Sequence, residues 1–515
     1  MPREPPLKRM PKNGSPANAG GFLSRPGVTG VLIFAGFAMY YLSFCQYGIN
    51  LWDEGGLFYG GERYLHGQRV FKDFLGYPPG IYWIAEGTFR LFGDDMLPLR
   101  RVLAVLTAFF PVLGWLIARR FLSGAWLAAA VLLVASAPAV YYQRSYALML
   151  LFAAWAVLAY LGDRKQWPWM LAAAAAAYFF KVEVLLITAP LYAWLLLDAY
   201  GFRRRGWALL AAAAVFFTLF FWNDLVDFLL FKIRTELSQW GNSFPVPWLS
   251  YQGASFGLFT FLDNMLFYMP FVAGALLAGH GLRAKGLADD ERMRFLTLAY
   301  FQTGAMALVV MRAGFDNLTR CLPLFFIAAV VLARLAVLQV RDPGWRRIAV
   351  AACVLLWWFY IADFNVLKGF YTGSVGAVRE VTTVVAEGKA RGVVAAEADA
   401  GVIGRMTEWI RLAAPPGEAI FAAPLNPIWY YLSERENPTF YDWVLPGTLR
   451  GPADEERLVA QLRAARPALV IVVDIAIDNK AERRLSAYAP RFSAWVLDGY
   501  VYSGAVNYFQ IWRRK

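Results

Sequence analysis

The chain has 515 residues, of which 59% are hydrophobic and 17% charged, and its mean hydropathy is +0.43. This composition excludes an ordinary soluble domain and predicts a polytopic membrane protein. The net charge of +13 does not indicate nucleic-acid binding, because the Lys and Arg residues lie in short clusters between apolar runs and form no continuous basic face.

The apolar runs predict eleven membrane spans that follow a basic N-terminal tail, residues 1–27. The fifth and sixth runs could form one helix, but Lys181 and Glu183 divide them. With this division every alternate loop is basic, as expected for cytoplasmic loops, and we expect a transmembrane domain over 28–366 with a cytoplasmic N-terminus. The spans are expected near residues 28–49, 97–118, 124–142, 146–161, 169–180, 184–199, 206–222, 265–281, 295–311, 318–340 and 347–366.

The first outer loop, residues 50–96, carries the main functional signal. It begins with the acidic pair Asp53-Glu54, followed by the flexible pair Gly55-Gly56, at the mouth of the first span. Further on, Tyr77-Pro78-Pro79-Gly80 forms a rigid turn that leads into an aromatic, amphipathic stretch suited to the level of the lipid headgroups. Two carboxylates at a membrane surface indicate a chemical site, although solvated acids that end a helix would give the same pattern.

Two later regions are also predicted to lie on the outer side. Residues 223–264 contain Trp and Pro among apolar residues and are expected to form an interfacial or lid-like loop. Residues 367–515 have the composition of a soluble segment and are expected to form an α/β domain. Within it we expect strands over 418–423 and 468–473, a helix over 453–465 and a hairpin over 495–512.

Several kinds of site are disfavoured by the sequence. It contains neither a Walker-type glycine loop nor a G-x-G-x-x-G motif, which argues against soluble nucleotides as substrates. The two histidines, His66 and His280, fall on opposite sides of the membrane, which argues against a histidine metal cluster and against Ser-His-Asp hydrolysis. Because Cys45, Cys321 and Cys353 all lie in apolar runs, a disulfide framework is not expected.

The order and spacing of these features resemble the GT-C membrane glycosyltransferases, particularly bacterial relatives of protein O-mannosyltransferases and of lipid A aminoarabinose transferases. The resemblance covers most of the chain. It rests on Asp53-Glu54 in the first outer loop and on Tyr77-Pro78-Pro79-Gly80 ahead of a further amphipathic helix. Asp73 matches a second acidic residue that relatives often carry shortly before the proline pair.

The resemblance extends to basic residues on the outer side. Arg144, after the third span, and Lys181 stand where relatives carry an Arg and a Lys, although Lys181 could equally mark a structural helix break. The stretch from Arg312 through Asp316 to Arg320 approximates an outer Arg-x-x-Asp-x-x-His element, but the His is missing.

This resemblance implies an inverting transfer of a sugar from a polyprenyl-phosphate donor to a hydroxyl of an envelope lipid, glycan or protein. A hydroxyl is a poor nucleophile, so we expect Asp53 to act as its general base. Glu54 is expected to assist by orienting a basic side chain, by helping to hold a divalent cation or by changing the pKa of Asp53. Basic residues are expected to stabilise the leaving phosphate. The candidates are Lys181, Arg144 and Arg320 for the phosphate, with Asp73, Tyr77, Pro78, Pro79, Arg312 and Asp316 in support.

No cofactor is required by this scheme, and a divalent metal ion stays an open alternative. The expected location is the bacterial inner membrane, with the C-terminal domain in the periplasm. Two other function classes remain: a transporter, which would place charges near the midplane of broken helices, and a scaffold subunit of envelope polysaccharide assembly. The sugar and the acceptor cannot be read from the motifs.

Overall fold

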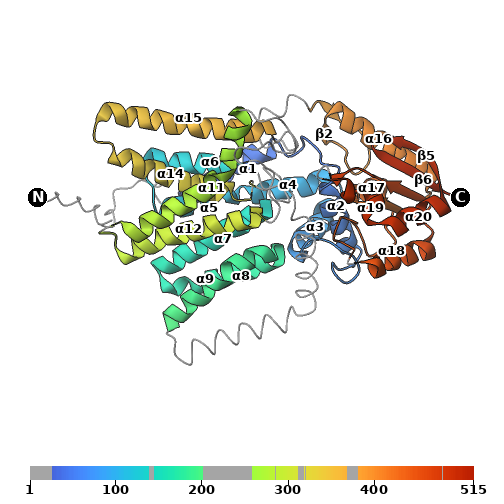
Figure 1. The fold of residues 1–515 in the computed structure, drawn as a ribbon, viewed down its shortest axis with the longest axis horizontal. Helices are drawn as coiled ribbons and strands as arrows, with labels where there is room; N and C mark the ends of the chain where they lie inside the picture. The colour runs from blue at the N-terminus through green and yellow to red at the C-terminus, as the bar shows by residue number, and fades with distance from the viewer. Residues whose placement is uncertain are drawn as a thin grey trace, which may run out of the picture.

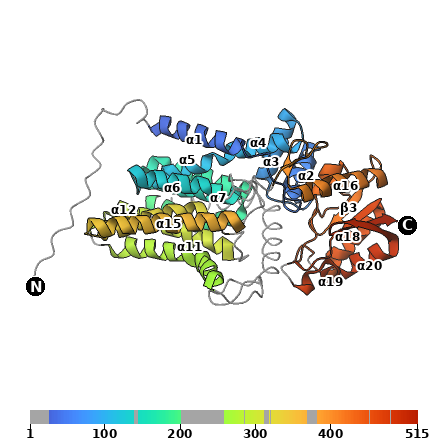
Figure 2. The same ribbon diagram turned by 90° about the horizontal axis from the view of Figure 1, so that it is seen from above.

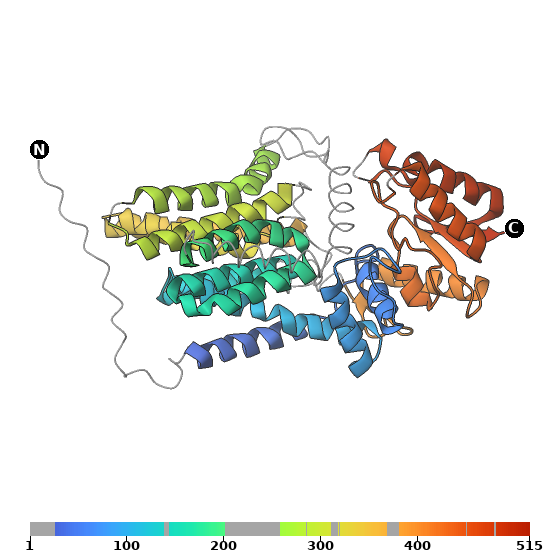
Figure 3. The same ribbon diagram turned by 90° about the horizontal axis from the view of Figure 1, so that it is seen from below.

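The computed structural model contains a helical bundle and a C-terminal α/β unit at opposite ends of the molecule, with α2 (Glu54–Leu65) and α3 (Pro79–Phe92) between them (Figure 1). Figure 2 shows the same order from above, and in Figure 3 the blue segment of α2 and α3 lies beside the orange and red C-terminal elements. The structure describes residues 26–137, 144–200, 258–284, 286–310, 318, 320–367, 381–449, 451–477 and 480–515.

The helices of the bundle coincide with ten of the eleven predicted spans, α4 and α5 together forming one of them; the run near 206–222 lies outside the described residues. Within the described residues, two stretches, Met96–Ala118 and Leu322–Gln339, are by themselves long and apolar enough to cross a membrane. The number of spans therefore stays a prediction. The bundle helices are α1 (Pro26–Leu42), α4 (Met96–Thr107), α5 (Phe109–Ala118), α6 (Gly124–Ser136), α7 (Arg144–Gly162), α8 (Trp167–Phe180), α9 (Val182–Tyr200), α11 (Leu258–Arg283), α12 (Asp289–Val310), α14 (Leu322–Gln339) and α15 (Pro343–Leu367).

The backbone defines two boundaries that the sequence analysis addresses. Lys181 has φ −159° and ψ 102°, an extended conformation that ends α8 and separates it from α9. The long apolar stretch is therefore two helices, as the charge pattern predicts. The predicted loop 223–264 ends earlier than expected, because α11 already begins at Leu258; residues 223–257 lie outside the described part of the chain.

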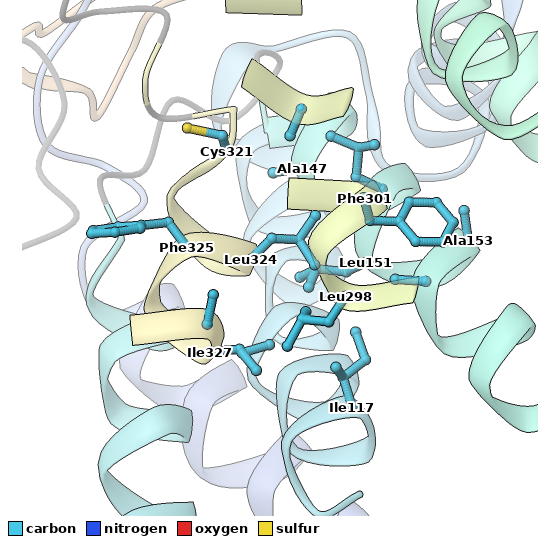
Figure 4. Close-up of a cluster of buried hydrophobic side chains, with 14 of the residues drawn as sticks. Ile117, Ala147, Leu151, Ala153, Leu298, Phe301, Cys321, Leu324, Phe325 and Ile327 are labelled. Atoms are coloured by element: carbon cyan, nitrogen blue, oxygen red, sulfur yellow. The ribbon is translucent and has the colours of Figure 1, made fainter. Parts of the chain in front are cut away.

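The interior of the bundle is a continuous apolar cluster contributed by α5 to α9, α11, α12 and α14. Figure 4 shows Leu151 and Leu298 packed at its centre, with Ala147 and Cys321 toward one end and Ile117 toward the other. Because lipid tails are as apolar as these side chains, close packing and not transfer from water holds such helices together.

The C-terminal unit has a four-stranded sheet in the order β3, β4, β6, β5. β3 and β4 pair in parallel, and the other two pairs are antiparallel. The predicted strands and the helix between them are confirmed, but the hairpin begins later than predicted because α20 continues through 499. The elements are β1 (Thr383–Val384), β2 (Val394–Ala395), α16 (Glu397–Ala413), β3 (Ile420–Ala423), α17 (Ile428–Ser433), α18 (Pro452–Ala465), β4 (Leu469–Val472), α19 (Leu485–Tyr488), α20 (Pro490–Gly499), β5 (Tyr500–Val506) and β6 (Phe509–Arg514).

The C-terminal unit and the first outer loop share one hydrophobic core, in which side chains between Ala38 and Ala108 pack with side chains between Val385 and Ile511. Backbone hydrogen bonds join the two parts as well. The N–H of Leu75 donates to the carbonyl of Phe440 over 2.7 Å, and the N–H of Met96 donates to the carbonyl of Lys389 over 2.8 Å. The sequence predicts a separate domain here, whereas the core continues across its predicted boundary.

Buried ion pairs cross the same boundary. The ammonium group of Lys389, a residue only 8% exposed, lies 2.5 Å from a carboxylate oxygen of Glu62 and 2.5 Å from one of Asp94. Burial alone would lower the pKa of Lys389, but the two carboxylates raise it above its ordinary value. Arg63 and Asp442 form a second buried pair at 2.6 Å. Removing one member of such a pair leaves an uncompensated buried charge, so α2 is firmly attached to the C-terminal unit.

Replacing Lys389 with Met is expected to lower the free energy of unfolding at pH 7 by about 3–5 kcal/mol, because the buried carboxylate of Glu62 loses its cation, whereas the more exposed Asp94 adds little. Because the pKa of Lys389 is raised in the folded state, its contribution is complete below the ordinary lysine pKa of about 10.4 and is lost as the pH rises through the higher folded value. The difference in stability between wild type and Lys389→Met should therefore shrink above about pH 10. Unfolding in detergent across this range measures it, with the exposed Lys72→Met as control.

Candidate active site at the start of α2

The acidic pair lies at the first residues of α2, and Asn50 organises the turn that leads into this helix. The side-chain oxygen of Asn50 accepts the backbone N–H groups of Trp52 and Asp53 over 2.9 and 3.0 Å, and its side-chain NH₂ donates to the Asp53 carboxylate over 3.0 Å. Asp53 is the residue before the first turn of α2 and is half-buried. Its backbone and its carboxylate are thus both held by one side chain.

Glu54 is 2% exposed and binds Arg100, which comes from α4 and is 1% exposed. The Nε and Nη2 groups of Arg100 donate to the two carboxylate oxygens of Glu54 over 3.1 and 2.6 Å. Arg100 also donates from Nη1 to the carbonyl of Gly48 over 2.7 Å, and the N–H of Asn50 donates to Glu54 over 3.0 Å. This is a bidentate buried pair with further hydrogen bonds, the geometry in which such a pair is most favourable.

The sequence predicts no role for Arg100, because this residue lies within an apolar run predicted to span the membrane. Of the roles open for Glu54, the observed contacts favour that of orienting a basic side chain. A buried Arg inside an apolar run is a signal that could have pointed to this residue, since such charges are rare unless they are paired.

Gly55 and Gly56 follow the pair inside α2, where they allow close packing and are not flexible. A side chain on Gly55 would collide with the backbone of Ile428 in α17. A Cβ on Gly56 would lie 2.9 Å from the Trp443 ring and 3.3 Å from the Tyr77 ring. The interpretation of this pair as a flexible element is wrong, because neighbouring chain segments occupy the space that side chains would need.

The turn at Tyr77-Pro78-Pro79-Gly80 begins α3. Pro78 is the residue before the helix, with φ −54° and ψ 151°, and Pro79 takes the first helical position, where the missing N–H costs nothing. The N–H of Tyr77 donates to the hydroxyl of the buried Tyr82 over 2.8 Å. A Cβ on Gly80 would lie 2.9 Å from the carbonyl oxygen of Phe179 in the last turn of α8, so this glycine lets α3 approach the end of α8.

Lys181 follows that last turn and is brought to the same place. It is 7% exposed, and its ammonium group lies 5.3 Å from the centre of the Tyr77 ring, within the range of a cation–π contact. Tyr77 therefore contacts Lys181 on one side. On another side its ring lies next to Gly56, in the first turn of α2, which follows Asp53. The structure thus gathers three predicted elements, namely the start of α2, the proline turn and the break between α8 and α9.

The other predicted residues lie outside this contact. Asp73 is exposed, and its carboxylate accepts a hydrogen bond from the backbone N–H of Arg69 over 2.8 Å. This bond stabilises the local turn. Arg144 is the first residue of α7, and Arg320 is half-buried just before α14. In Figure 4, Ala147 and Cys321, close to them in the chain, lie toward the same end of the bundle. Arg312 and Asp316 lie outside the described residues.

The described residues contain no group of three or more His, Cys, Asp or Glu side chains placed to hold a metal ion. Glu54 would have to give up contacts with Arg100 or Asn50 to become a ligand. A divalent ion therefore stays a prediction of the sequence.

Residues 77–222 match the family model described as dolichyl-phosphate-mannose-protein mannosyltransferase. The match confirms the predicted resemblance to GT-C glycosyltransferases. The matched part includes Tyr77, the proline turn and Lys181. It begins after Asp53-Glu54, so the roles of these two acids rest on the geometry. No curated protein matches the sequence.

Three solved structures are similar to the chain over most of its length. ArnT from Cupriavidus metallidurans bound to undecaprenyl phosphate is 14% identical, with a TM-score of 0.46 over 94% of this chain and 97% of that one. The apo form of that ArnT is 16% identical, with a TM-score of 0.48 over 94% and 98%. The oligosaccharyltransferase AglB from Archaeoglobus fulgidus, in complex with an inhibitory peptide and a dolichol-phosphate, is 13% identical, with a TM-score of 0.47 over 96% and 75%. With TM-scores below 0.5, these likenesses have no bearing on the activity.

Replacing Arg100 with Met, or Glu54 with Leu, is expected to lower the free energy of unfolding by about 3–5 kcal/mol, because each change leaves one buried charge without its partner. The double variant should lose less than the sum of the two. Denaturant unfolding in detergent measures this coupling. As control, Arg90→Ala removes the partly exposed pair of Arg90 with Glu86 and should cost no more than about 1 kcal/mol. Strictly additive losses would contradict the pairing.

Proposed function

We propose that this chain is an inverting glycosyltransferase that moves a sugar from a polyprenyl-phosphate donor to a hydroxyl of a cell-envelope lipid, glycan or protein. The match over residues 77–222 to a family named for dolichyl-phosphate-mannose supports a lipid phosphate as the carrier. We further propose that the protein spans the bacterial inner membrane, with a cytoplasmic N-terminus and a periplasmic C-terminal unit. The alternation of basic loops supports this orientation.

One observation carries the proposal: the first turn of α2, which follows Asp53, and the buried Lys181 both lie next to Tyr77. Asp53 lies one turn before Gly56, whose position faces the Tyr77 ring, and the ammonium group of Lys181 lies against the same ring. A transfer from a phosphate leaving group requires a general base and a cation in one site. A buried ionisable residue at the end of a membrane helix also favours a functional role over a structural one.

The reaction assigns one task to each group. The acceptor oxygen attacks the anomeric carbon from the face opposite the phosphate, and its proton passes to the carboxylate of Asp53. The bond between the anomeric carbon and the phosphate oxygen breaks, and its electron pair stays on the polyprenyl phosphate. Lys181 stabilises that charge, with Arg144 and Arg320 as further candidates. A single displacement inverts the anomeric centre.

Glu54 and Arg100 take a positioning role in this scheme. They are buried together and do not need to touch the sugar, but they set where α2 begins and hence where the Asp53 carboxylate lies. A site held within a fraction of an ångström by such contacts needs little rearrangement during the reaction.

Asp53→Asn is expected to reduce the rate of transfer roughly 100- to 10,000-fold, since the amide cannot accept the proton. The assay measures transfer from a panel of polyprenyl-phosphate sugars to envelope lipids and glycans by the purified full-length protein. The matched control is Asp73→Asn, which changes an exposed acid of the same loop and should leave the rate nearly unchanged. Full activity of Asp53→Asn would refute the assignment of the base. A wild type that binds no donor would instead favour the scaffold or transporter.

Lys181→Met is expected to lower kcat roughly 100- to 1,000-fold with a smaller change in KM, because the charge on the phosphate is larger in the transition state than in the bound donor. Lys181→Arg, which keeps the charge, should recover part of the activity. The exposed Lys72→Met is the control. An effect confined to KM would mean that Lys181 only binds the donor.

A further inference from the structure

A cavity of 340 Å³ with two charged residues in its lining lies at the end of the bundle away from α2 and α3 (Figure 1). Its lining includes Arg120, which follows α5, and Trp155 from α7, together with Asp163 and Gln166 from the short link between α7 and α8. Ile117, three residues before Arg120, lies at the end of the packed core opposite Cys321 (Figure 4). The cavity is therefore separate from the proposed active site.

Arg120 brings a cation to this cavity. Among the described residues, none accepts a hydrogen bond from its guanidinium or pairs with it, whereas its basic neighbours are engaged. Arg119 lies over the Trp115 ring at 4.8 Å, and Arg294 pairs with Asp290 at 3.0 Å. Partial burial, with the charges of Arg294 and Arg119, lowers the pKa of Arg120. A bound anion would relieve this repulsion.

Asp163 places an anion on the same lining. One of its carboxylate oxygens accepts the N–H of Lys165 over 3.0 Å, and its backbone carbonyl accepts the N–H of Gln166 over 2.9 Å. These bonds fix the link as a turn. Because the carboxylate and the guanidinium of Arg120 do not form an ion pair, the cavity presents two separated and opposite charges.

Aromatic side chains beside the cavity are typical of a membrane interface. The Trp155 ring stacks on the Phe152 ring with centroids 5.7 Å apart. The centroid of the Trp169 ring lies 5.9 Å from that of Trp155. Trp169 is 50% exposed and Leu171, on the same helix, is 38% exposed, so the cavity adjoins an apolar surface suited to lipid chains.

We propose that this cavity binds the phosphoethanolamine headgroup of a membrane phospholipid. The phosphate takes its hydrogen bonds from Arg120, and the ammonium group donates to Asp163. A glycerol headgroup lacks the positive charge that Asp163 would meet, and a choline headgroup has no N–H to donate. The site therefore selects phosphatidylethanolamine. This inference goes beyond the proposed transfer and does not depend on it.

Native mass spectrometry of the full chain tests the proposal, with phosphatidylethanolamine, phosphatidylglycerol and phosphatidylcholine of identical acyl chains offered separately. The wild type is expected to retain phosphatidylethanolamine about tenfold more strongly than the other two. Arg120→Gln and Asp163→Asn should each abolish this preference. The matched controls should keep it: Arg119→Gln changes the neighbouring guanidinium, and Asp342→Asn changes another exposed acid that accepts a backbone N–H.

A soluble competitor separates headgroup recognition from binding of the chains. Glycerophosphoethanolamine in excess is expected to displace the phospholipid from the wild type. Equal retention of the three lipids, failure of the soluble headgroup to compete, or equal losses in the controls would each overturn the proposal. If Arg120→Gln does not fold, as judged by its melting temperature and elution volume, Asp163→Asn alone decides between these outcomes.

Discussion

The buried pair of Glu54 and Arg100 is the contact on which the candidate site depends. Both side chains are almost fully removed from solvent, and each is the main partner of the other. A buried charge is tolerated only when it is paired and hydrogen-bonded, so α2 can begin at one place relative to α4. Asp53 precedes Glu54 in the chain, and Asn50 holds both its backbone and its carboxylate. The position of the proposed base therefore follows from a neighbour that does not take part in the reaction.

The C-terminal unit holds α2 from its other side. Lys389 forms ion pairs with Glu62 and Asp94, and Arg63 forms one with Asp442. The glycines at the start of α2 leave room for the backbone of α17 and for the ring of Trp443. α2 thus lies between the bundle and the sheet, and both parts fix its orientation. For the proposed function this means that the C-terminal unit forms part of the framework of the site, whatever else it binds.

The two ends of the bundle differ in chemistry. At the end next to α2, Lys181 is buried against Tyr77, a setting that strengthens its interaction with a phosphate because little water competes. At the opposite end, Arg120 and Asp163 line an open cavity together with Trp155. The first arrangement suits stabilisation of a charge that develops during a reaction, and the second suits recognition of a headgroup that stays bound.

The sequence predicted a polytopic membrane protein, the positions of the described bundle helices, the break at Lys181 and the strands β3 and β4 with the helix α18 between them. It could do so because long apolar runs, prolines and the distribution of basic loops act locally along the chain. It also selected Tyr77 and Lys181, which lie in contact, and Asp53, which lies one turn before the Gly56 position that faces the Tyr77 ring. Only the tertiary structure revealed Arg100 as the partner of Glu54, the packing role of Gly55 and Gly56, and the continuous core beneath the C-terminal unit. These depend on contacts between residues from tens to several hundred positions apart, and no local pattern of charge or hydropathy specifies which distant segment fills the space beside a glycine or neutralises a buried acid.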